Sequence, residues 1–397
     1  MHVKESSLLY MKSIIILGAT GSVGLTALEA LYTLRDTHKV KSIMVRGSDI
    51  QKLEKIVKAF NIANVIVANK NAIAQIGNTN FDRKVRILHE TKEIHDFLQH
   101  EKHDICISAI SGIAGLIPTI LTMYSCKKLI IANKEAIICG NKLFIEHATK
   151  LKVEIIPIDS EHHAIHSILT LNNTTNTCNT TNVKKLILTA TGSTIWKNKI
   201  LPKNASKDDI LTHPIWKMGN VITVNSASMM NKVFEMHEAS ILFNIPMQNV
   251  DALLHPTATV HGIVQYKDGT SIMHCGTPTM FSPIIAAILY PQKYDVHKAQ
   301  NLQQECELIR NRTFEFYDID TDLFPLFKLA RINMTHSSII ALNALNEFYV
   351  QQFLDGKVSF YEMINSIENK FEKYSKNTNI QSFQDVIEYH DSIQKML

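Results

Sequence analysis

The sequence predicts an α/β protein in three parts: an N-terminal Rossmann-like, doubly wound parallel sheet, a central α+β domain with a flap, and a C-terminal helical domain. Three observations lead to this class. Short apolar runs alternate with helical patterns up to residue 159, and a glycine-rich turn follows the first apolar run. From about residue 322 onward the periodicity is helical.

The composition is that of an ordinary water-soluble globular protein, with 45% hydrophobic and 20% charged residues in 397. The formal net charge is only +4 and the lysines are dispersed, so no basic stripe of the kind that binds nucleic acid is present. Six cysteines are widely spaced without a metal-binding pattern. They predict reduced thiols in a cytoplasmic protein.

Six strands are expected in the N-terminal part, because each is a short apolar run bounded by polar or turn residues. They cover 13–17, 41–45, 64–67, 104–108, 128–132 and 154–158. Helical patterns such as 23–34 and 51–60 lie between most of them. This alternation is typical of an open parallel sheet, which binds ligands at the carboxyl ends of its strands.

One uncharged run, 105–123, approaches the length of a membrane span. Its Gly112, Gly115 and Pro118 fit a buried strand, a glycine turn and a helix starting near Pro118 better than a membrane helix. No membrane partner is therefore expected. Residues 1–11 lack the apolar core of a signal peptide and are expected to form a short extension, with Met11 as an alternative start.

The glycine-rich turn reads GATGSVG from Gly18 to Gly24 and stands between an apolar run and a helical pattern. Such a turn lets a dinucleotide pyrophosphate approach the backbone and lie on the helix N-terminus. The second expected strand ends before Arg46, Ser48 and Asp49. An acidic residue there commonly binds a ribose diol and favours NAD, whereas Arg46 and Ser48 suit a 2′-phosphate, so both coenzymes stay open.

Beyond residue 159 the pattern changes, and the Asn/Thr-rich segment 171–182 is expected to be a mobile loop. Later strands are expected at 185–189, 221–224, 250–254, 260–266 and 271–274, with helices at 337–354, after Ser359 and after Ser382. The expected domains are nucleotide-binding at 12–159, catalytic and connective at 160–290 with a flap near 210–220, a linker at 291–320, and helical at 321–397.

Two carboxylates, Asp159 and Glu161, follow the strand expected at 154–158. In an extended backbone they point to the same side and repel each other unless a cation lies between them. Oxygen ligands suit Mg²⁺ or Mn²⁺, and Glu235 is a possible third ligand. The alternative is a strand end whose Asp159 or Ser160 caps the following helix.

The segment 225–238 reads NSASMMNKVFEMHE. As a single helix it places Ser228, Asn231, Lys232 and Glu235 on one face. A cation, neutral hydrogen-bonding groups and a carboxylate together suit a substrate with a phosphate at one end and metal-binding oxygens at the other. The alternative is a surface helix with scattered polar residues.

Three further motifs have both a functional and a plain structural interpretation. Pro214 and Gly219 bracket Trp216 in a segment that is typical of a lid, although Trp216 could instead pack on the domain surface. The Asn-Lys-Glu run at 133–135 follows a strand, where ligands bind, but also fits an ordinary helix start. His261 is expected to be a core histidine.

Taken in order, these motifs resemble the 1-deoxy-D-xylulose 5-phosphate reductoisomerase family of the non-mevalonate isoprenoid pathway, from Lys12 onward. The agreement of many separate blocks at matching spacing carries the resemblance. The blocks are GATGSVG at 18–24, the stretch 109–119, ANKE at 132–135, PIDSEH at 157–162, HPIWKMG at 213–219, NSASMMNK at 225–232, HPTATVHGIVQYKDG at 255–269 and LNALNE at 342–347.

The resemblance implies a homodimer that isomerises and reduces a small sugar phosphate with NADPH and Mn²⁺ or Mg²⁺. It implies metal ligands at Asp159, Glu161 and Glu235, and catalytic roles for Lys134, Glu161, His213 and Glu235. The implied substrate contacts are Lys134, Ser160, Glu161, Thr191, His213, Ser226, Asn231, Lys232 and Glu235. The implied cofactor contacts are Thr20, Gly21, Ser22, Val23, Gly47, Asn133, Glu135 and Gly219. The implied flap residues are Trp216 and Met218.

The chain departs from the family pattern in three places. The family's loop TGSGGPF or TASGGPF reads TATGSTI here, with Thr191 keeping a hydroxyl at the serine position. The family's aspartate before the serine of NSASMMNK is Asn225, and its Gly-Lys-Asn near the ribose is Gly-Ser-Asp at 47–49. Two other functions stay open: another metal-assisted NAD(P) oxidoreductase, such as a hydroxy-acid or semialdehyde dehydrogenase, and a catalytically silent nucleotide sensor.

Overall fold

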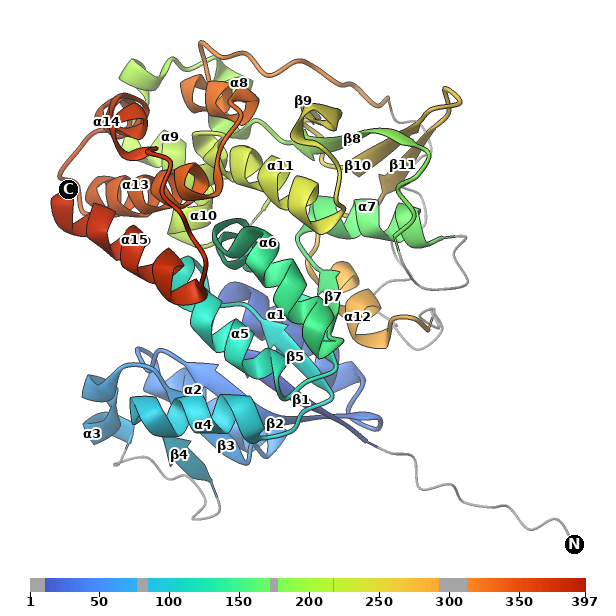
Figure 1. The fold of residues 1–397 in the computed structure, drawn as a ribbon, viewed down its shortest axis with the longest axis vertical. Coiled ribbons are helices and arrows are strands. Elements are labelled where there is room, and N and C mark those ends of the chain that lie inside the picture. Colours follow the sequence, from blue (N-terminus) through green and yellow to red (C-terminus); the bar gives the residue numbers. More distant parts are fainter. Residues whose placement is uncertain (1–10, 77–84, 172–177, 217, 293–312) are drawn as a thin grey trace, which may run out of the picture.

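The computed structural model describes residues 11–76, 85–171, 178–216, 218–292 and 313–397 (Figure 1). Nearly all of the expected N-terminal extension, half of the Asn/Thr-rich segment and most of the expected linker therefore lie outside the described residues. The described chain forms two sheets and a group of C-terminal helices, which confirms the predicted fold class.

The first sheet has seven parallel strands in the order β4-β3-β2-β1-β5-β6-β7. Its strands are β1 (Lys12–Leu17), β2 (His38–Val45), β3 (Asn64–Val67), β4 (Arg86–Leu88), β5 (Ile105–Ser108), β6 (Lys128–Ile131) and β7 (Glu154–Pro157). Six of them were predicted from the sequence. The short edge strand β4 was not predicted, because three residues give no readable alternation.

Helices cover both faces of this sheet. On one face lie α4 (Thr91–His100), α5 (Leu116–Met123) and α6 (Lys134–Leu151), and on the other α1 (Ser22–Thr33) and α2 (Ile50–Phe60), with the single turn α3 (Ile73–Ile76) at the β3 side. Inside the run 105–123, β5, a turn at Gly112 and α5 follow one another, which confirms the expected strand, turn and helix.

The second sheet has four strands in the order β11-β10-β8-β9. They are β8 (Val183–Ala190), β9 (Val250–Leu254), β10 (Val260–Tyr266) and β11 (Ser271–Cys275), and only β8 and β9 run parallel. Two helices join this sheet to the first one: α7 (Ser160–Thr170) packs on β10 and β11, and α11 (Met230–Leu242) packs on β8, β9 and α6. Short helices α8 (Ser193–Asn198) and α9 (Lys207–Leu211) lie at its other end.

Two predictions between residues 220 and 238 are wrong. The strand expected at 221–224 is part of the helix α10 (Asn220–Ala227), since a four-residue apolar run does not distinguish a strand from a helix. The single helix expected over 225–238 is broken at Met229, whose φ of 62° is left-handed, and α11 starts one residue later. Ser228 therefore does not share a helical face with Asn231 and Glu235.

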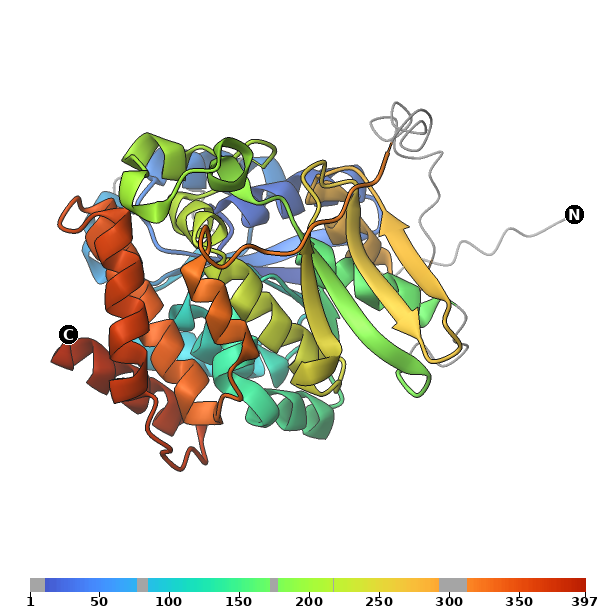
Figure 2. The ribbon, with the colours of Figure 1, turned by 90° about the horizontal axis from the view of Figure 1, so that it is seen from above.

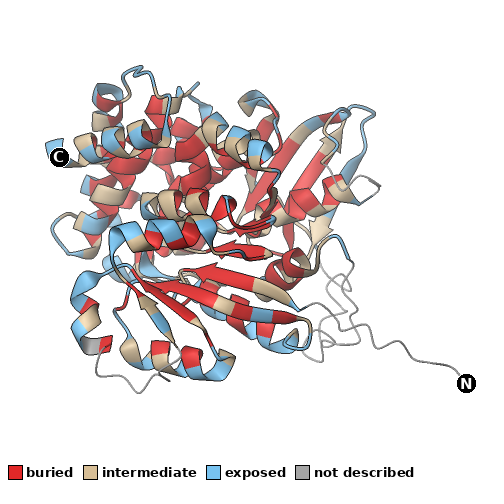
Figure 3. Ribbon diagram, turned by 60° about the horizontal axis from the view of Figure 1, so that its bottom comes forward, coloured by how far each residue is buried: buried red, intermediate tan, exposed pale blue. Residues whose placement is uncertain are grey.

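The C-terminal helices are α13 (His336–Leu354), α14 (Phe360–Tyr374) and α15 (Phe383–Met396), with η7 (Pro325–Arg331) before them. The side chains of Ser359 and Ser382 accept the backbone bonds that start α14 and α15, as expected for helices after these serines. Figure 2 places these helices at one side of the molecule and the second sheet at the other. Most residues of α13 are buried, and Figure 3 shows that buried residues gather where the helices and sheets pack together.

One more helix, α12 (Phe281–Leu289), returns to the first sheet and packs on α1. The remaining single turns are η1 (Lys70–Ala72), η2 (Ile113–Gly115), η3 (Pro202–Asn204) and η4 (Met247–Asn249). Among the described helices, none is both long and apolar enough to cross a bilayer.

Candidate active site

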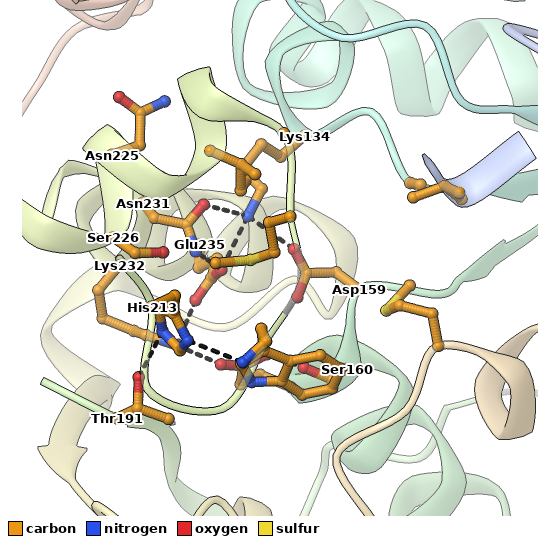
Figure 4. Close-up of a pocket in the computed structure, with 18 of the residues that line it drawn as sticks. Lys134, Asp159, Ser160, Thr191, His213, Asn225, Ser226, Asn231, Lys232 and Glu235 are labelled. Atoms are coloured by element: carbon orange, nitrogen blue, oxygen red, sulfur yellow. Dashed lines mark hydrogen bonds and ion pairs between the residues drawn. The ribbon is translucent and has the colours of Figure 1, made fainter. Parts of the chain in front are cut away.

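A cavity of about 480 Å³ lies where the carboxyl edge of the first sheet meets the second half of the chain (Figure 4). One wall comes from the start of α1, the loop after β5 and the start of α6. The facing wall comes from α7, α10, α11 and the segment 213–219. Open parallel sheets bind ligands at this edge, so the cavity is the principal candidate site.

The glycine-rich turn is shaped by two close backbone approaches. A Cβ at Gly18, whose φ is +89°, would lie 2.6 Å from the carbonyl oxygen of Ala109, and one at Gly24 would lie 2.3 Å from the carbonyl oxygen of Gly18. The turn therefore lies directly against the end of β5. Among the described residues no side chain caps the N-terminus of α1, so its first N–H groups can bind an anion beside the cavity wall at Ser22 and Val23.

The end of β2 lies outside the cavity lining. Gly47 has a φ of +93°, and a Cβ there would lie 2.7 Å from that of Ala72. Asp49 caps α2, since its carboxylate accepts the N–H of Lys52 at 2.9 Å. Arg46, Ser48 and Asp49 are all exposed to solvent.

Three carboxylates meet at the centre of the cavity. Asp159, Glu161 and Glu235 each offer an oxygen, and these oxygens lie within 4.8 Å of one another. The extended backbone assumed for residues 159–161 is wrong, because α7 begins at Ser160. The alternative role of Asp159 as a helix cap is not seen either, since its side chain makes no capping hydrogen bond. The helical start nevertheless turns both carboxylates toward α11.

Two buried lysines neutralise most of this charge. Nζ of Lys134 lies 2.6 Å from Oδ2 of Asp159, 2.7 Å from Oε1 of Glu235 and 2.7 Å from Oδ1 of Asn231. Nζ of Lys232 lies 2.6 Å from Oε1 of Glu161 and also pairs with Glu235. Each lysine side chain is only 4% exposed, so both ammoniums need these carboxylates to offset the free-energy cost of burying their charge.

The pKa values follow from burial and crowding. Burial disfavours the charge on Lys134, but Asp159 and Glu235 outweigh it and hold the pKa well above its ordinary value. Burial and the neighbouring charge of Glu235 raise the pKa of Glu161 to about 7, against the attraction of Lys232. One carboxylate of the cluster therefore binds a proton readily, which is what closely spaced like charges do.

A second acidic group lies behind the first and was not recognised in the sequence. His162 and Glu238 approach Asp159, with Nε2 of His162 lying 2.9 Å from the carbonyl oxygen of Glu235 and 3.5 Å from Oε2 of Glu238. Neither residue lines the cavity. The only signal in the sequence is spacing, because His162 lies three residues after Asp159 and Glu238 lies three residues after Glu235.

His213 organises the segment that carries the predicted flap residues. Its Nδ1 accepts the N–H of Trp216 at 2.9 Å and that of Ile215 at 3.2 Å. Nε2 therefore carries the hydrogen and donates to Oγ1 of Thr191 at 2.9 Å. Burial lowers the pKa of His213 to about 4, which keeps this neutral form. Trp216 lines the cavity and lies 6.3 Å from the ring of His261.

Most predicted site residues are brought together, but not all of them. The predicted residues that line the cavity are Ser22, Val23, Lys134, Glu135, Asp159, Ser160, Glu161, Thr191, His213, Trp216, Met218, Gly219, Ser226, Asn231, Lys232 and Glu235. Thr20, Gly21, Gly47 and Asn133 are not among the lining residues. Asn133 instead caps α6, and it also donates to the carbonyl oxygen of Gly112 at 2.9 Å.

The structure also adds lining residues that the sequence did not single out. They include Ser111 after β5, Ile222 in α10 and Met280 before α12. His261, expected in the core, is buried and also lines the cavity. Ser111 could have been noticed because it follows a predicted strand, whereas Met280 reaches the site only through the return of the chain to α1.

These features define a class of protein. It is an α/β protein whose open parallel sheet ends at a cavity that is lined by the N-terminus of α1 and by a carboxylate–lysine cluster. That arrangement suits dinucleotide-dependent chemistry on an anionic substrate.

Comparison with known proteins defines the family. The family model for 1-deoxy-D-xylulose 5-phosphate reductoisomerase matches residues 14–141, the model for its C-terminal domain matches 155–243, and a second DXP reductoisomerase C-terminal domain matches 275–396. The chain therefore belongs to the 1-deoxy-D-xylulose 5-phosphate reductoisomerase family, which confirms the resemblance noted in the sequence.

Individual relatives cover almost the entire chain. The 1-deoxy-D-xylulose 5-phosphate reductoisomerase of Thermodesulfovibrio yellowstonii is 33% identical over 389 residues, which is 97% of this chain and 98% of that protein. The enzyme of the same name from Wolbachia sp. subsp. Drosophila simulans is also 33% identical, over 95% of this chain and 94% of its own. A crystal structure of DOX-P reductoisomerase with NADPH, fosmidomycin and magnesium superposes with a TM-score of 0.84 at 28% identity, covering 97% of both chains.

Proposed function

We propose that this chain isomerises 1-deoxy-D-xylulose 5-phosphate and reduces the rearranged product to 2-C-methyl-D-erythritol 4-phosphate, using NADPH and a divalent cation, for isoprenoid precursor synthesis. The observation that carries the proposal is the cluster of three carboxylates and two buried lysines in a cavity that the N-terminus of α1 also lines. The relatives named for this activity, and the crystal relative that binds NADPH and magnesium, support the same conclusion.

The residues fit a hard divalent cation. Asp159, Glu161 and Glu235 are all oxygen donors within 4.8 Å of one another, which suits Mg²⁺ and equally Mn²⁺. Burial and the crowding of the three carboxylates raise the pKa of Glu161, and a divalent cation between the carboxylates would relieve their repulsion. When bound, such a cation supplies Lewis-acid polarisation of the substrate's carbonyl and hydroxyl oxygens.

The facing wall suits a sugar phosphate. Lys232 and Asn231 project from α11 and Ser226 projects from α10, so an ammonium, an amide and a hydroxyl converge on one part of the cavity (Figure 4). Groups of these types bind phosphate oxygens well. Binding energy gained there would orient the reacting oxygens toward Ser160 and the ammonium of Lys134. We assign Lys134 to electrostatic or proton-transfer assistance, together with Glu161, Glu235 and His213.

The opposite wall suits the dinucleotide, which supplies the hydride for the reduction when it is bound. The N–H groups at the start of α1, near Thr20, Gly21, Ser22 and Val23, would bind the pyrophosphate. Gly47 would lie near the ribose, and Glu135 and Gly219 near the nicotinamide. Asn133 would act through the backbone that it holds, because its side chain accepts the N–H of Ala136 and donates to the carbonyl oxygens of Ile110 and Gly112.

The segment 213–219 would close over the bound substrate. His213 holds the backbone N–H of Trp216 and the hydroxyl of Thr191 at once, so it ties this segment to the loop after β8. With Trp216 and Met218 over the cavity, the segment would exclude water from a reactive aldehyde.

We assign nucleotide binding to residues 12–159, catalysis to residues 160–290 and structural support of the active site to residues 321–397.

The edge strand β11 exposes Ile272 and Met273, which favours pairing with a second copy as a homodimer. Five of the cysteines are described and all five are free thiols, which is consistent with a cytoplasmic location.

The test is the absorbance of NADPH at 340 nm in the presence of 1-deoxy-D-xylulose 5-phosphate, with Mg²⁺, with Mn²⁺ or with EDTA. We expect oxidation that requires both the sugar phosphate and a divalent cation. Oxidation that persists in EDTA, or that runs with a hydroxy acid or semialdehyde but not with the sugar phosphate, would contradict the proposal.

A further inference from the structure

The C-terminal helix α13 contributes two neighbouring polar side chains that reach opposite walls of the cavity. Nδ2 of Asn346 donates to Oδ1 of Asn225 at 3.1 Å, and Asn225 lines the cavity from α10. Oε1 of Glu347 accepts the backbone N–H of Ile113 at 2.8 Å, in the loop that continues from the lining residues Ile110 and Ser111. Consecutive residues of a helix point about 100° apart, which lets one helix hold two walls.

Both contacts are reinforced by their surroundings, the first by burial and the second by further hydrogen-bonding and charged partners. Asn346 and Asn225 are 2% and 3% exposed, so losing their hydrogen bond would leave a buried amide oxygen without a donor. Glu347 also accepts the amide of Asn343 at 3.1 Å, and Nε2 of His390 in α15 lies 3.4 Å from its other oxygen. Burial opposes the charge on Glu347, yet His390 and the N–H of Ile113 outweigh it and lower the pKa.

The loop held by Glu347 is part of the nucleotide-side wall. Gly112 has a φ of +75°, and a Cβ there would lie 2.8 Å from Oε1 of Glu347, so the carboxylate lies directly against the backbone of this turn. On the other side of the turn, Asn133 donates to the carbonyl oxygen of Gly112 and caps the helix that begins with Lys134. Continuous contacts therefore run from α15 and α13 to the residue beside the carboxylate cluster.

We propose that Glu347 and Asn346 are positioning residues of this enzyme, Glu347 for the dinucleotide wall and Asn346 for the sugar-phosphate wall. Neither touches the reacting groups. The assignment of the two walls rests on the proposed function. The C-terminal helices therefore affect ligand binding, because Glu347 acts on the affinity for the dinucleotide and Asn346 acts on the affinity for the sugar phosphate.

The experiment measures two dissociation constants on the full chain: NADPH by nicotinamide fluorescence, and 1-deoxy-D-xylulose 5-phosphate by calorimetry with NADP⁺ and Mg²⁺ present. For Glu347→Met we expect NADPH binding to weaken about tenfold and sugar-phosphate binding to change less than about threefold, since one partly buried, charge-assisted hydrogen bond is lost. For Asn346→Leu we expect the reverse. Glu347→Gln retains the acceptor for Ile113 and should bind NADPH within about threefold of wild type.

Glu362→Met is the matched control, because Glu362 is an exposed carboxylate that only completes the capping box of α14 in the same helical region. It should change neither constant. If Glu347→Met does not fold, Gly112→Ala replaces it and should weaken NADPH binding about tenfold, since its Cβ displaces the loop from Glu347.

Unchanged NADPH affinity in the folded variant, or both constants moving together in both single variants, would overturn the proposal. A wild-type chain that binds NADPH but no sugar phosphate would instead contradict the proposed function, and the comparison of NADPH affinities would still test Glu347.

Discussion

The ammonium of Lys134, the first residue of α6, lies 2.7 Å from Oε1 of Glu235 in α11, and both side chains are almost completely buried. This pair joins the first sheet to the second half of the chain at the centre of the cavity. Because a buried ion pair offsets a large desolvation cost, removing one partner leaves the other charge without compensation. A change at this pair should therefore alter the stability of the fold, the affinity for the metal and the catalytic rate together.

Replacing Lys134 by Met should destabilise the metal-free protein and make it more responsive to metal. We expect a loss of about 3 kcal/mol in the free energy of unfolding without metal, as for other broken buried pairs. Mg²⁺ should then raise the melting temperature more in the variant than in wild type, since a cation replaces the missing positive charge. Differential scanning fluorimetry across a Mg²⁺ titration measures both effects.

Lys128→Met is the matched control for that experiment. Lys128 is also a buried lysine, but it donates to carbonyl oxygens at the end of α12, including that of Ala287 at 3.4 Å. Its loss should destabilise the protein without changing the response to Mg²⁺. Equal Mg²⁺-induced shifts in the Lys134 variant and wild type would show that this ammonium does not lie at the metal site.

Two isosteric variants distinguish the two acidic groups around Asp159. Glu235→Gln should lower metal-dependent turnover on the order of 100-fold and weaken Mn²⁺ binding, because a carboxylate that would bind the cation directly is lost. Glu238→Gln should change either quantity less than about tenfold, since Glu238 does not line the cavity. Electron paramagnetic resonance of bound Mn²⁺ gives a readout independent of activity. Stronger loss from Glu238→Gln would place the cation on the His162 side instead.

The convergence of these groups shows what the sequence could and could not predict. Asp159 and Glu161 were singled out because both follow the recognisable strand at 154–158, and strand ends of a parallel sheet share one edge. Strands β9 and β10 have the predicted boundaries, because both are long enough to show a β pattern. The turn at Met229 left no signal, since methionine rarely adopts a left-handed backbone. His162 was not recognised because its contacts with Glu235 and Glu238 come from another helix.

Coenzyme preference should depend on the two exposed residues after Gly47. Asp49 would repel a 2′-phosphate, and Ser48 offers it no charge. We expect Ser48→Lys to raise the ratio of kcat/KM for NADPH over NADH about fivefold, as exposed charge pairs typically allow. Asp49→Asn should move the ratio the same way by a smaller factor, and asparagine retains the cap of α2.

Steady-state rates with each coenzyme, supported by fluorescence titration of both, would measure this ratio. Lys58→Met is a suitable control, because it removes an exposed charge from the last turn of α2 and should leave the ratio unchanged. A ratio that does not respond to Ser48→Lys would show that the 2′-phosphate binds elsewhere, with Arg46 as the next residue to test.

The stability of the first sheet should fall in acid because of His103. This residue is 4% exposed, and its Nε2 lies 2.8 Å from Oγ of Ser42. Burial, assisted by the charge of Lys41, lowers its pKa to about 4. The unfolded chain has the ordinary value of about 6.5, so it binds more protons than the folded chain between these two pH values. The stabilisation is therefore complete above pH 6.5 and is lost as the pH falls toward 4.

His103→Gln removes this titration while an amide can still reach Ser42. Urea unfolding at pH 7.5, 6, 5 and 4.5 should show wild type losing about 3 kcal/mol more than the variant over this range. His95→Gln, at an exposed position of α4, should leave the wild-type pH dependence unchanged. Parallel pH dependences for wild type and His103→Gln would mean that His103 is protonated in the folded chain, and other buried histidines would then account for the acid sensitivity.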